Sequence, residues 1–351
     1  MSVQPNNLCF PVTLESVLSP LMAACDKVAV LCDTNTHAFC LPLLLKEVPQ
    51  LKEACVITIA PGDEAKELTT VEQIWQQMME MGLTRRSLLI NLGGGVVTDL
   101  GGFAAATYQR GLRFVNLPTS LLAIVDASAG GKTGFNFCGV KNQIGVFAEA
   151  ECVAVFPAFL ATLPETEFYS GLAEMVKHAL LSDLQMVYQT LGCTVDDVKQ
   201  ADFLQLLRKN TAVKQHFVEQ DPHDHGLRNA LNLGHTFAHA FEAHAMGKGM
   251  TLPHGTAVMW GLLCALYLSI VRFAFPKEIL TALFQFAREN YAQIPFSCKD
   301  YEALLQYMMT DKKNGFGKIC FTLLADVADV RIRQEVTKEE IFAALDFLRE
   351  Y

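Results

Sequence analysis

The chain has 351 residues, of which 51% are hydrophobic and 19% are charged, and its formal net charge is -9. This composition is typical of a well-packed globular protein and argues against disorder. The negative charge disfavours broad binding to nucleic acid or an anionic membrane, so an anionic ligand needs a local cluster of Lys and Arg. The length predicts two domains.

Eleven cysteines lie between Cys9 and Cys320, and no two of them form a Cys-x-x-Cys pair. The odd number fits neither a disulfide framework nor a thiolate zinc site. A reducing cytosol is the setting this pattern favours. The first residues lack a charged segment followed by an apolar run, so we expect no signal peptide and a cytoplasmic protein.

Short apolar runs alternate with helical patterns in the first part of the chain. The runs from Lys27 to Leu31, from Cys55 to Ala60 and from Ser87 to Leu92 predict buried strands. Helical spacing covers Leu43 to Val48 and Thr69 to Met81. Strands that alternate with helices predict a parallel sheet with helices on its faces.

The third of these strands runs into Gly93-Gly94-Gly95 and then into a small-residue helix, Val96 to Tyr108. Glycine lets the backbone approach a diphosphate, and the helix N-terminus that follows offers unpaired N–H groups. This favours a nucleotide, although tight turns in α/β proteins use the same residues for packing. The spacing differs from Gly-x-Gly-x-x-Gly, so a standard Rossmann first turn is not predicted.

A second glycine-rich stretch, Gly130 to Gly134, follows the short strand Phe114 to Leu117. It resembles part of a P-loop but lacks the spacing that a nucleotide triphosphatase requires. Lys132 lies within it, and Lys141 and Asn142 follow soon afterwards. Two lysines near a flexible backbone suit a phosphorylated ligand, although solvated loop lysines are common.

The pattern changes around Pro157 and Pro164, and we place the domain boundary there. Residues 1–157 are predicted to form an α/β domain and residues 158–351 a mostly helical one. The apolar segment Ala257 to Phe275 contains Ser269 and Arg272, and we interpret it as a core helix rather than a membrane span.

Histidines and a buried carboxylate make the second domain the candidate metal-binding region. If Asn232 to Ala243 is helical, His235 and His239 lie on one face and could share a metal. His254 follows nearby, and Glu174 lies in an apolar helix where a lone carboxylate is costly to bury. Partly buried histidines and an ordinary salt bridge are the alternatives.

Five motifs in order strongly resemble the 3-dehydroquinate synthases: GGGVVTDLGGFAAATYQRG, LPTSLLAIVDASAGGKTG, VKNQIG, ATLPETEFYSGLAEMVKH and LRNALNLGHTFAHAFE. The likeness covers the chain from about Asp33 to about Lys313. It implies a homodimer whose subunits join a Rossmann-like NAD-binding α/β domain to a mostly α-helical domain, with the active site in the cleft between them.

The resemblance also implies a reaction. The phosphorylated heptulosonic acid 3-deoxy-D-arabino-heptulosonate 7-phosphate is converted to 3-dehydroquinate and phosphate by a cyclising carbon–oxygen lyase. NAD oxidises a hydroxyl and regains its oxidised form after phosphate elimination, and ring opening and an intramolecular aldol reaction follow. A divalent metal, most often zinc with cobalt as the alternative, polarises the oxygen at the oxidised carbon.

The site residues implied by the resemblance fall into three sets. The metal ligands are Glu174, His235 and His254. The catalytic and substrate-binding residues are Lys132, Lys177, Lys214, Arg228, Asn232, His239, Asn142, Lys312 (from the Lys312-Lys313 pair) and, from the neighbouring subunit, Arg110. The NAD-binding residues are Asp33, Asn35, Asp63, Lys66, Gly93, Gly94, Gly95, Asp99, Thr119, Ser120, Asp126, Lys141, Asn142, Thr162 and Glu167.

Four positions depart from the family pattern. Asp63 and Asp224 stand where Glu is usual, Ser120 replaces a Thr and Ala127 replaces a Ser. The shorter Asp63 side chain puts its ribose contact in doubt, and the role of Asp224 stays open.

Three other classes of protein are weighed against this one. Deoxy-scyllo-inosose and epi-valiolone synthases share the pattern but take substrates without a carboxylate, and the retained Lys214, Arg228, Asn232 and His239 favour the carboxylated substrate. Polyol dehydrogenases, such as the glycerol dehydrogenases, release the reduced cofactor. A non-enzymatic binding protein is disfavoured by the full set of metal, cation and glycine positions.

Overall fold

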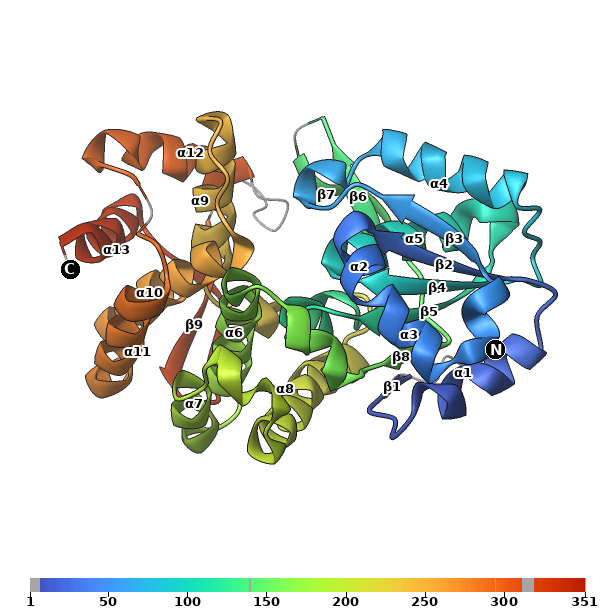
Figure 1. Ribbon diagram of the computed structural model, residues 1–351. Helices are drawn as coiled ribbons and strands as arrows, with labels where there is room; N and C mark the ends of the chain where they lie inside the picture. The colour runs from blue at the N-terminus through green and yellow to red at the C-terminus, as the bar shows by residue number, and fades with distance from the viewer. Residues whose placement is uncertain (1–6, 139, 294, 311–318, 351) are drawn as a thin grey trace. The chain divides into compact units, whose positions relative to one another are not determined.

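The computed structural model describes residues 7–138, 140–293, 295–310 and 319–350. The chain forms two compact units, Met1–Glu167 and Phe168–Tyr351 (Figure 1). The division follows Glu167 rather than Pro157 because the turn Pro157–Thr162 packs with the first unit, where Phe159 is buried in the core.

A parallel sheet of six strands organises the first unit, in the order β1-β8-β5-β4-β2-β3. The strands are β1 (Leu8–Cys9), β2 (Val28–Asp33), β3 (Cys55–Ile59), β4 (Leu88–Gly93), β5 (Arg113–Pro118) and β8 (Cys152–Ala154). The helices are α1 (Leu14–Ala23), α2 (Thr34–Phe39), α3 (Leu41–Glu47), α4 (Leu68–Glu80) and α5 (Gly95–Thr107). The predicted parallel sheet and its first strands are confirmed.

Side chains of the strands alternate between two cores, one on each face of the sheet. In β2, Ala29 and Leu31 face a core that includes residues of α4 and α5, whereas Val30 and Cys32 face a core that includes residues of α1 and α3. This alternation follows from the two-residue period of a strand. Both faces are covered, as a parallel sheet requires.

The glycine-rich stretch after β5 leads into regular structure. β6 (Lys132–Phe137) and β7 (Val140–Phe147) form an antiparallel hairpin. A Cβ at Gly134 would lie 2.2 Å from the Ile144 carbonyl oxygen, so glycine here permits close approach of the two strands. Within β6, Phe135 is buried in the core that contains residues of α5.

The second unit is mostly helical. Its helices are α6 (Glu165–Leu180), which begins at the unit boundary, α7 (Leu184–Leu191), α8 (Ala201–Gln220), α9 (His235–Gly247), α10 (His254–Phe273), α11 (Lys277–Asn290), α12 (Tyr301–Thr310) and α13 (Lys338–Glu350). Strands β9 (Cys320–Asp326) and β10 (Asp329–Glu335) form an antiparallel pair. α10 is long and apolar enough to cross a membrane, and 72% of its most apolar window is buried against α9, α11, α13 and β9.

Helix α9 begins three residues later than predicted from the pattern Asn232 to Ala243. Leu227–Asn232 forms a separate 3-10 turn, and Gly234 adopts a left-handed conformation with φ 78° and ψ -20°. Glycine tolerates this conformation without a steric penalty. The consequence is that His235 becomes the first residue of α9.

Candidate metal centre and dinucleotide site

Three side chains from separate helices converge in the second unit. Glu174 lies on α6, and His235 and His254 are the first residues of α9 and α10. Nε2 of each histidine lies 3.2 Å from Oε1 of Glu174. Tetrahedral ligands about 2.0–2.1 Å from zinc lie roughly 3.3–3.4 Å apart, so these distances match two edges of such a site. The structure thus brings together the three residues that the sequence nominated as ligands.

Two glycines next to the histidines allow this convergence. A Cβ at Gly255 would lie 2.2 Å from Cα of Ser170 on α6, and a Cβ at Gly234 would lie 2.8 Å from the backbone nitrogen of Leu262 on α10. The Ser170 hydroxyl also accepts a hydrogen bond from the Gly255 backbone N–H at 3.0 Å. Backbone contact at both crossings therefore determines where the two imidazoles stand.

The protonation of His235 suits a metal ligand. Its Nδ1 lies 3.1 Å from the Leu233 carbonyl oxygen, to which a ring nitrogen can only donate. Burial and the positive charge of Lys177 lower the pKa of His235 to about 4, against the opposing effect of Glu174. The neutral ring then presents an unprotonated Nε2 to a carboxylate oxygen. Two acceptors this close repel each other, and a cation bound between them removes the conflict.

Lys177 neutralises the buried carboxylate from the other side. Its Nζ lies 2.5 Å from Oε2 of Glu174, and both residues are almost completely buried. Although burial alone would raise it, the charge of Lys177 holds the pKa of Glu174 well below its usual value. Glu174 is therefore ionised and can bind a divalent cation.

Glu242 is a buried carboxylate beside the cluster that the sequence analysis missed. Its Oε1 lies 3.3 Å from Nδ1 of His254. Burial would lower the pKa of His254, but the charge of Glu242 and hydrogen bonds with Glu174 and Glu242 raise it to about 10. The sequence could have pointed to Glu242, because it is a carboxylate in an apolar helix, which is the criterion that selected Glu174.

His239 lies beside the three ligands without joining them. Its ring centroid is 5.5 Å from that of His235, and the two rings are perpendicular. Among the described residues, the cluster of potential ligands that contains His235 also contains His254 and not His239. The one-face pairing of His235 with His239 as joint ligands is therefore replaced by the pairing of His235 with His254.

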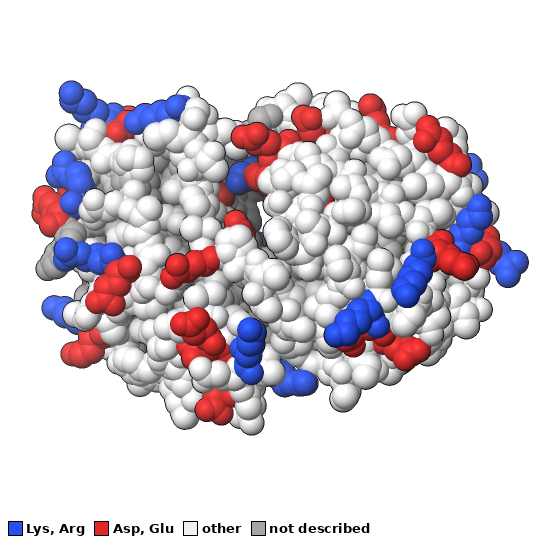
Figure 2. Space-filling view, viewed as in Figure 1, with Lys and Arg blue, Asp and Glu red and all other residues white. Residues whose placement is uncertain are grey.

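The remaining nominated cations of the second unit are buried. Helix α8, which carries Lys214, packs against the turn that carries Arg228 and Asn232, and Lys214 and Arg228 are each less than a tenth exposed. A guanidinium N–H of Arg228 donates to the Pro222 carbonyl oxygen at 2.9 Å. On the face seen in Figure 2, exposed Lys and Arg are interspersed with Asp and Glu. Lys312 lies outside the described residues.

The nominated dinucleotide residues of the first unit gather at one edge of its sheet. Asp33, Asp63, the glycines after β4 and Thr119 each follow the carboxyl end of a parallel strand. β2 has β3 on one side and β4 on the other, so the chain reverses direction across the sheet between β2 and β4. Ligands of parallel α/β sheets bind in the crevice at such a reversal.

The glycine loop after β4 fits a diphosphate. It leads into the 13-residue helix α5, whose first N–H groups have no partner within the helix. A Cβ at Gly94 would lie 3.3 Å from Oγ of Ser120, and one at Gly95 would lie 3.1 Å from Cβ of Ala127. Side chains at these glycines would thus fill the space between two loops, as expected for a backbone cradle.

Charged side chains around this loop are paired with one another. Nζ of Lys66 lies 2.6 Å from Oδ2 of Asp99 and also contacts Oδ1 of Asn142, and Nζ of Lys141 lies 3.1 Å from Oδ2 of Asp63. Asp33 caps α2 by accepting a hydrogen bond from the Thr36 N–H at 2.8 Å.

The other nominated residues of the first unit are placed less closely together. Asn35 lies on α2, Asp126 in a π-helical turn, Thr162 at the end of a 3-10 turn, Glu167 on α6, Lys132 and Asn142 in the hairpin, and Arg110 in an exposed turn after α5. Thr162 shares a neighbour with Thr119, because the Cys40 thiol interacts with both side chains.

A solved structure shares both the architecture and the full length of this chain. It is the 2-epi-5-epi-valiolone synthase from Streptomyces hygroscopicus subsp. jinggangensis 5008, whose structure holds NAD+ and Zn2+. Its sequence is 25% identical, its TM-score is 0.89, and the match covers 100% of this chain and 98% of that chain. The fold is that of the sugar phosphate cyclases, with a candidate metal cluster in the helical unit.

Sequence relatives narrow this class. The 3-dehydroquinate synthase of Parabacteroides distasonis is 44% identical over 93% of this chain and 92% of its own length, and that of Pyrococcus furiosus is 38% identical over 95% and 96%. Residues 56–170 match the family described as 3-dehydroquinate synthase N-terminal, and residues 171–314 match its C-terminal counterpart. The chain belongs to the 3-dehydroquinate synthase family, which confirms the resemblance seen in its motifs.

Proposed function

We propose that this protein is an NAD- and metal-dependent 3-dehydroquinate synthase. It acts on 3-deoxy-D-arabino-heptulosonate 7-phosphate as a cyclising lyase and releases phosphate. The observation that carries the proposal is the convergence of Glu174, His235 and His254 beside the buried cation Lys177, in a chain of this family.

Each set of residues has a task in this reaction. Glu174, His235 and His254 would hold a divalent metal, zinc or cobalt, which when bound polarises the substrate oxygen that becomes a carbonyl. The loop Gly93–Gly95 and the residues around Lys66 would hold NAD, which when bound accepts a hydride and returns it.

The chain's own cations bind and orient the anionic substrate. Lys214 and Arg228, with Asn232 and His239, bind its carboxylate and hydroxyl groups, because buried cations form strong bonds with carboxylates. Lys177 neutralises Glu174 and stabilises negative charge that develops on the substrate nearby. The phosphate binds to Lys132, Asn142, Lys312 and to Arg110 of a partner subunit in a cytoplasmic homodimer.

Phosphate release tests this assignment. The protein is incubated with the heptulosonate phosphate, with and without a chelator and added NAD, and phosphate and 3-dehydroquinate are measured. We expect both products in equal amounts, loss of activity with the chelator and recovery when metal is restored. His254→Ala is expected to abolish phosphate release and lower bound metal. NADH accumulation with a polyol, without phosphate release, would refute the proposal.

The similarity to a valiolone synthase supports one alternative, a cyclase whose substrate lacks the carboxylate. A sugar phosphate that lacks the carboxylate is the competing substrate to assay. The buried Arg228 and Lys214 favour the heptulosonate, because buried cations form strong hydrogen bonds with carboxylates. Faster turnover of the sugar phosphate without a carboxylate would establish the alternative.

A further inference from the structure

The two candidate histidine ligands differ in the group that holds Nδ1 of each ring. Nδ1 of His235 lies against a backbone carbonyl, that of Leu233, whereas Nδ1 of His254 lies against the carboxylate of Glu242. We propose that Glu242 is a positioning residue that holds His254 in its metal-binding orientation and strengthens metal binding through its negative charge. The inference rests on the proposed function, because it concerns the same metal centre.

Helix α9 supplies both parts of this arrangement. Glu242 follows His235 by seven residues, which is about two helical turns, so the two side chains leave the same face of the helix. His235 reaches Glu174 directly, and Glu242 reaches the outer nitrogen of His254. Helix α9 thereby carries one ligand, His235, and positions a second ligand, His254, through the carboxylate of Glu242.

The more exposed ligand has the charged partner. The side chain of His254 is 30% exposed, whereas that of His235 is 11% exposed and is confined by the start of α9. Packing alone therefore restrains the His254 ring less. A carboxylate at 3.3 Å from Nδ1 compensates, because it selects the ring orientation that directs Nε2 toward Glu174.

Charge supports the same role. The Glu174 carboxylate is already offset by Lys177 at 2.5 Å, so a divalent cation at this site adds two positive charges to a buried region. Burying uncompensated charge is costly. The carboxylate of Glu242, of which only 4% is exposed, lowers that excess by one and makes the His254 imidazole a better donor.

Zinc affinity of the purified full chain tests the proposal without reference to turnover. Apoprotein variants Glu242→Gln and Glu242→Ala are titrated with Zn2+ in competition with a chromophoric chelator. Glutamine keeps an oxygen that can accept from Nδ1–H but has no charge, so we expect affinity about tenfold below the parent. Alanine loses both contributions and is expected to approach a hundredfold.

A second carboxylate–histidine pair, whose histidine lies on α9, provides the matched control. Oδ1 of Asp300 lies 3.4 Å from Nε2 of His244, which is on α9 but outside the ligand cluster. Asp300→Asn removes a carboxylate from this pair, and we expect its zinc affinity to stay within twofold of the parent. An equal loss in Asp300→Asn would overturn the proposal, because the effect would then reflect general loosening of α9.

His254→Ala separates failure of this inference from failure of the proposed metal centre. If His254→Ala loses zinc while both Glu242 variants bind it as the parent does, Glu242 has no positioning role. If His254→Ala itself binds zinc as tightly as the parent, the ligand set is wrong. Should Glu242→Ala fail to fold, as judged by circular dichroism, the near-isosteric Glu242→Gln still decides between these outcomes.

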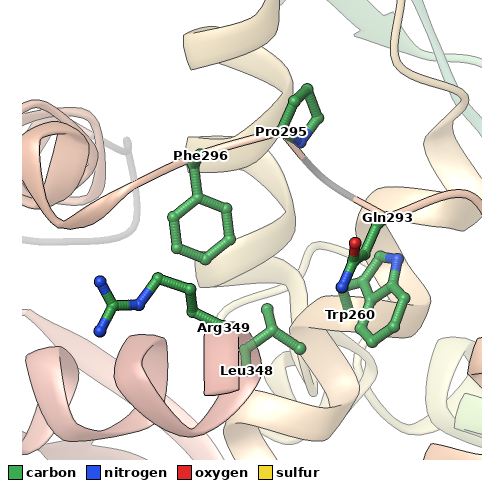
Figure 3. Close-up of a pocket in the computed structure, with 6 residues that line it drawn as sticks. All are labelled: Trp260, Gln293, Pro295, Phe296, Leu348 and Arg349. Carbon is green, nitrogen blue, oxygen red and sulfur yellow. The ribbon is translucent and has the colours of Figure 1, made fainter. Parts of the chain in front are cut away.

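The pocket nearest the C-terminal helix carries no proposal of its own. It is lined by Trp260, Gln293, Pro295, Phe296, Leu348 and Arg349 (Figure 3). The guanidinium of Arg349 is already paired with Asp346 at 3.2 Å, and nothing in the structure indicates the chemistry of an occupant.

Discussion

The two units assemble their candidate sites in different ways. In the first unit, Asp33, Asp63, Gly93 to Gly95 and Thr119 lie at or just after the ends of parallel strands, so the topology of the sheet collects these candidates at one edge. In the second unit, the ligands come from three helices that meet only because glycines permit backbone contact. The dinucleotide site should therefore tolerate local changes that the metal centre does not, and each site should respond to its own substitutions.

The largest effect is expected from the metal centre. His235→Ala removes one of three ligands, so we expect loss of bound metal and a fall in kcat/KM of at least about a thousandfold, because a Lewis acid contributes several kcal/mol. NAD affinity should be unchanged, since its nominated residues lie in the first unit. Metal content by atomic emission and NAD binding by fluorescence would measure the two separately.

A matched control is His216→Ala, which removes an exposed histidine on α8. This variant should keep both metal and activity. If His235→Ala lost NAD binding as well as metal, the two candidate sites would depend on each other, which contradicts the expected independence.

The converse substitution is in the first unit. Lys66→Met removes a buried cation that lies 2.6 Å from Asp99. We expect NAD to bind about 10- to 100-fold more weakly, because a charge-assisted hydrogen bond is lost, and metal content to stay at the parent level. Lys27→Met, which removes an exposed lysine bonded to the Met81 carbonyl, is the control. Unchanged NAD affinity in Lys66→Met would remove Lys66 from the proposed site.

The substitution Gly255→Ala adds one methyl group and tests whether the crossing of α10 over α6 positions His254. Gly255→Ala places a Cβ 2.2 Å from Cα of Ser170, and relief requires a backbone shift at the His254 position. We expect a loss of about 1–3 kcal/mol in the free energy of unfolding and weaker metal binding. Gly192→Ala is the control, since its Cβ would meet nothing closer than 3.6 Å. A destabilised variant with normal metal affinity would show that the crossing does not position His254.

The difference between the units also explains what the sequence could reveal. The strand Leu88–Gly93 and the glycines that follow it are local patterns. The parallel sheet could be predicted from such patterns, and the binding of a diphosphate by the glycine loop stays a prediction. The hairpin at Gly134 could not, because its close strand contact is indistinguishable in sequence from a flexible glycine-rich loop. Local patterns therefore described most of the first unit.

In the second unit, helical periodicity alone could not predict which residues form the candidate metal site. Helical spacing paired His235 with His239, whereas the histidine that shares Oε1 of Glu174 with His235 is His254. Its position depends on where α9 starts and how α10 crosses α6. The family resemblance supplied His254, because the segment Leu252-Pro253-His254-Gly255 matches the family's motif. Glu242 was left out even so, since it is neither a ligand nor at an unusual spacing.

The smallest effect is expected where hydrogen bonds alone hold a site residue. Asp221 begins the loop between α8 and Arg228, and its carboxylate accepts N–H bonds from His225, Gly226 and Arg228 at 2.9, 2.7 and 3.1 Å. The bond from His225, with the others, lowers the pKa of Asp221 to about 2. A lowered folded-state pKa contributes stability above the unfolded-state value of about 4, and this contribution is lost as the pH falls toward 2.

Asp221→Asn should therefore be less stable than the parent at pH 7, and the difference should shrink below about pH 4 as the parent carboxylate becomes protonated. Denaturant unfolding at several pH values would measure it. Glu219→Gln removes an exposed carboxylate two residues away and should show no such pH-dependent difference. A gap between Asp221→Asn and the parent that stays constant down to pH 2 would mean that the carboxylate's charge does not stabilise the loop, and that Arg228 is held by packing, as the metal ligands are.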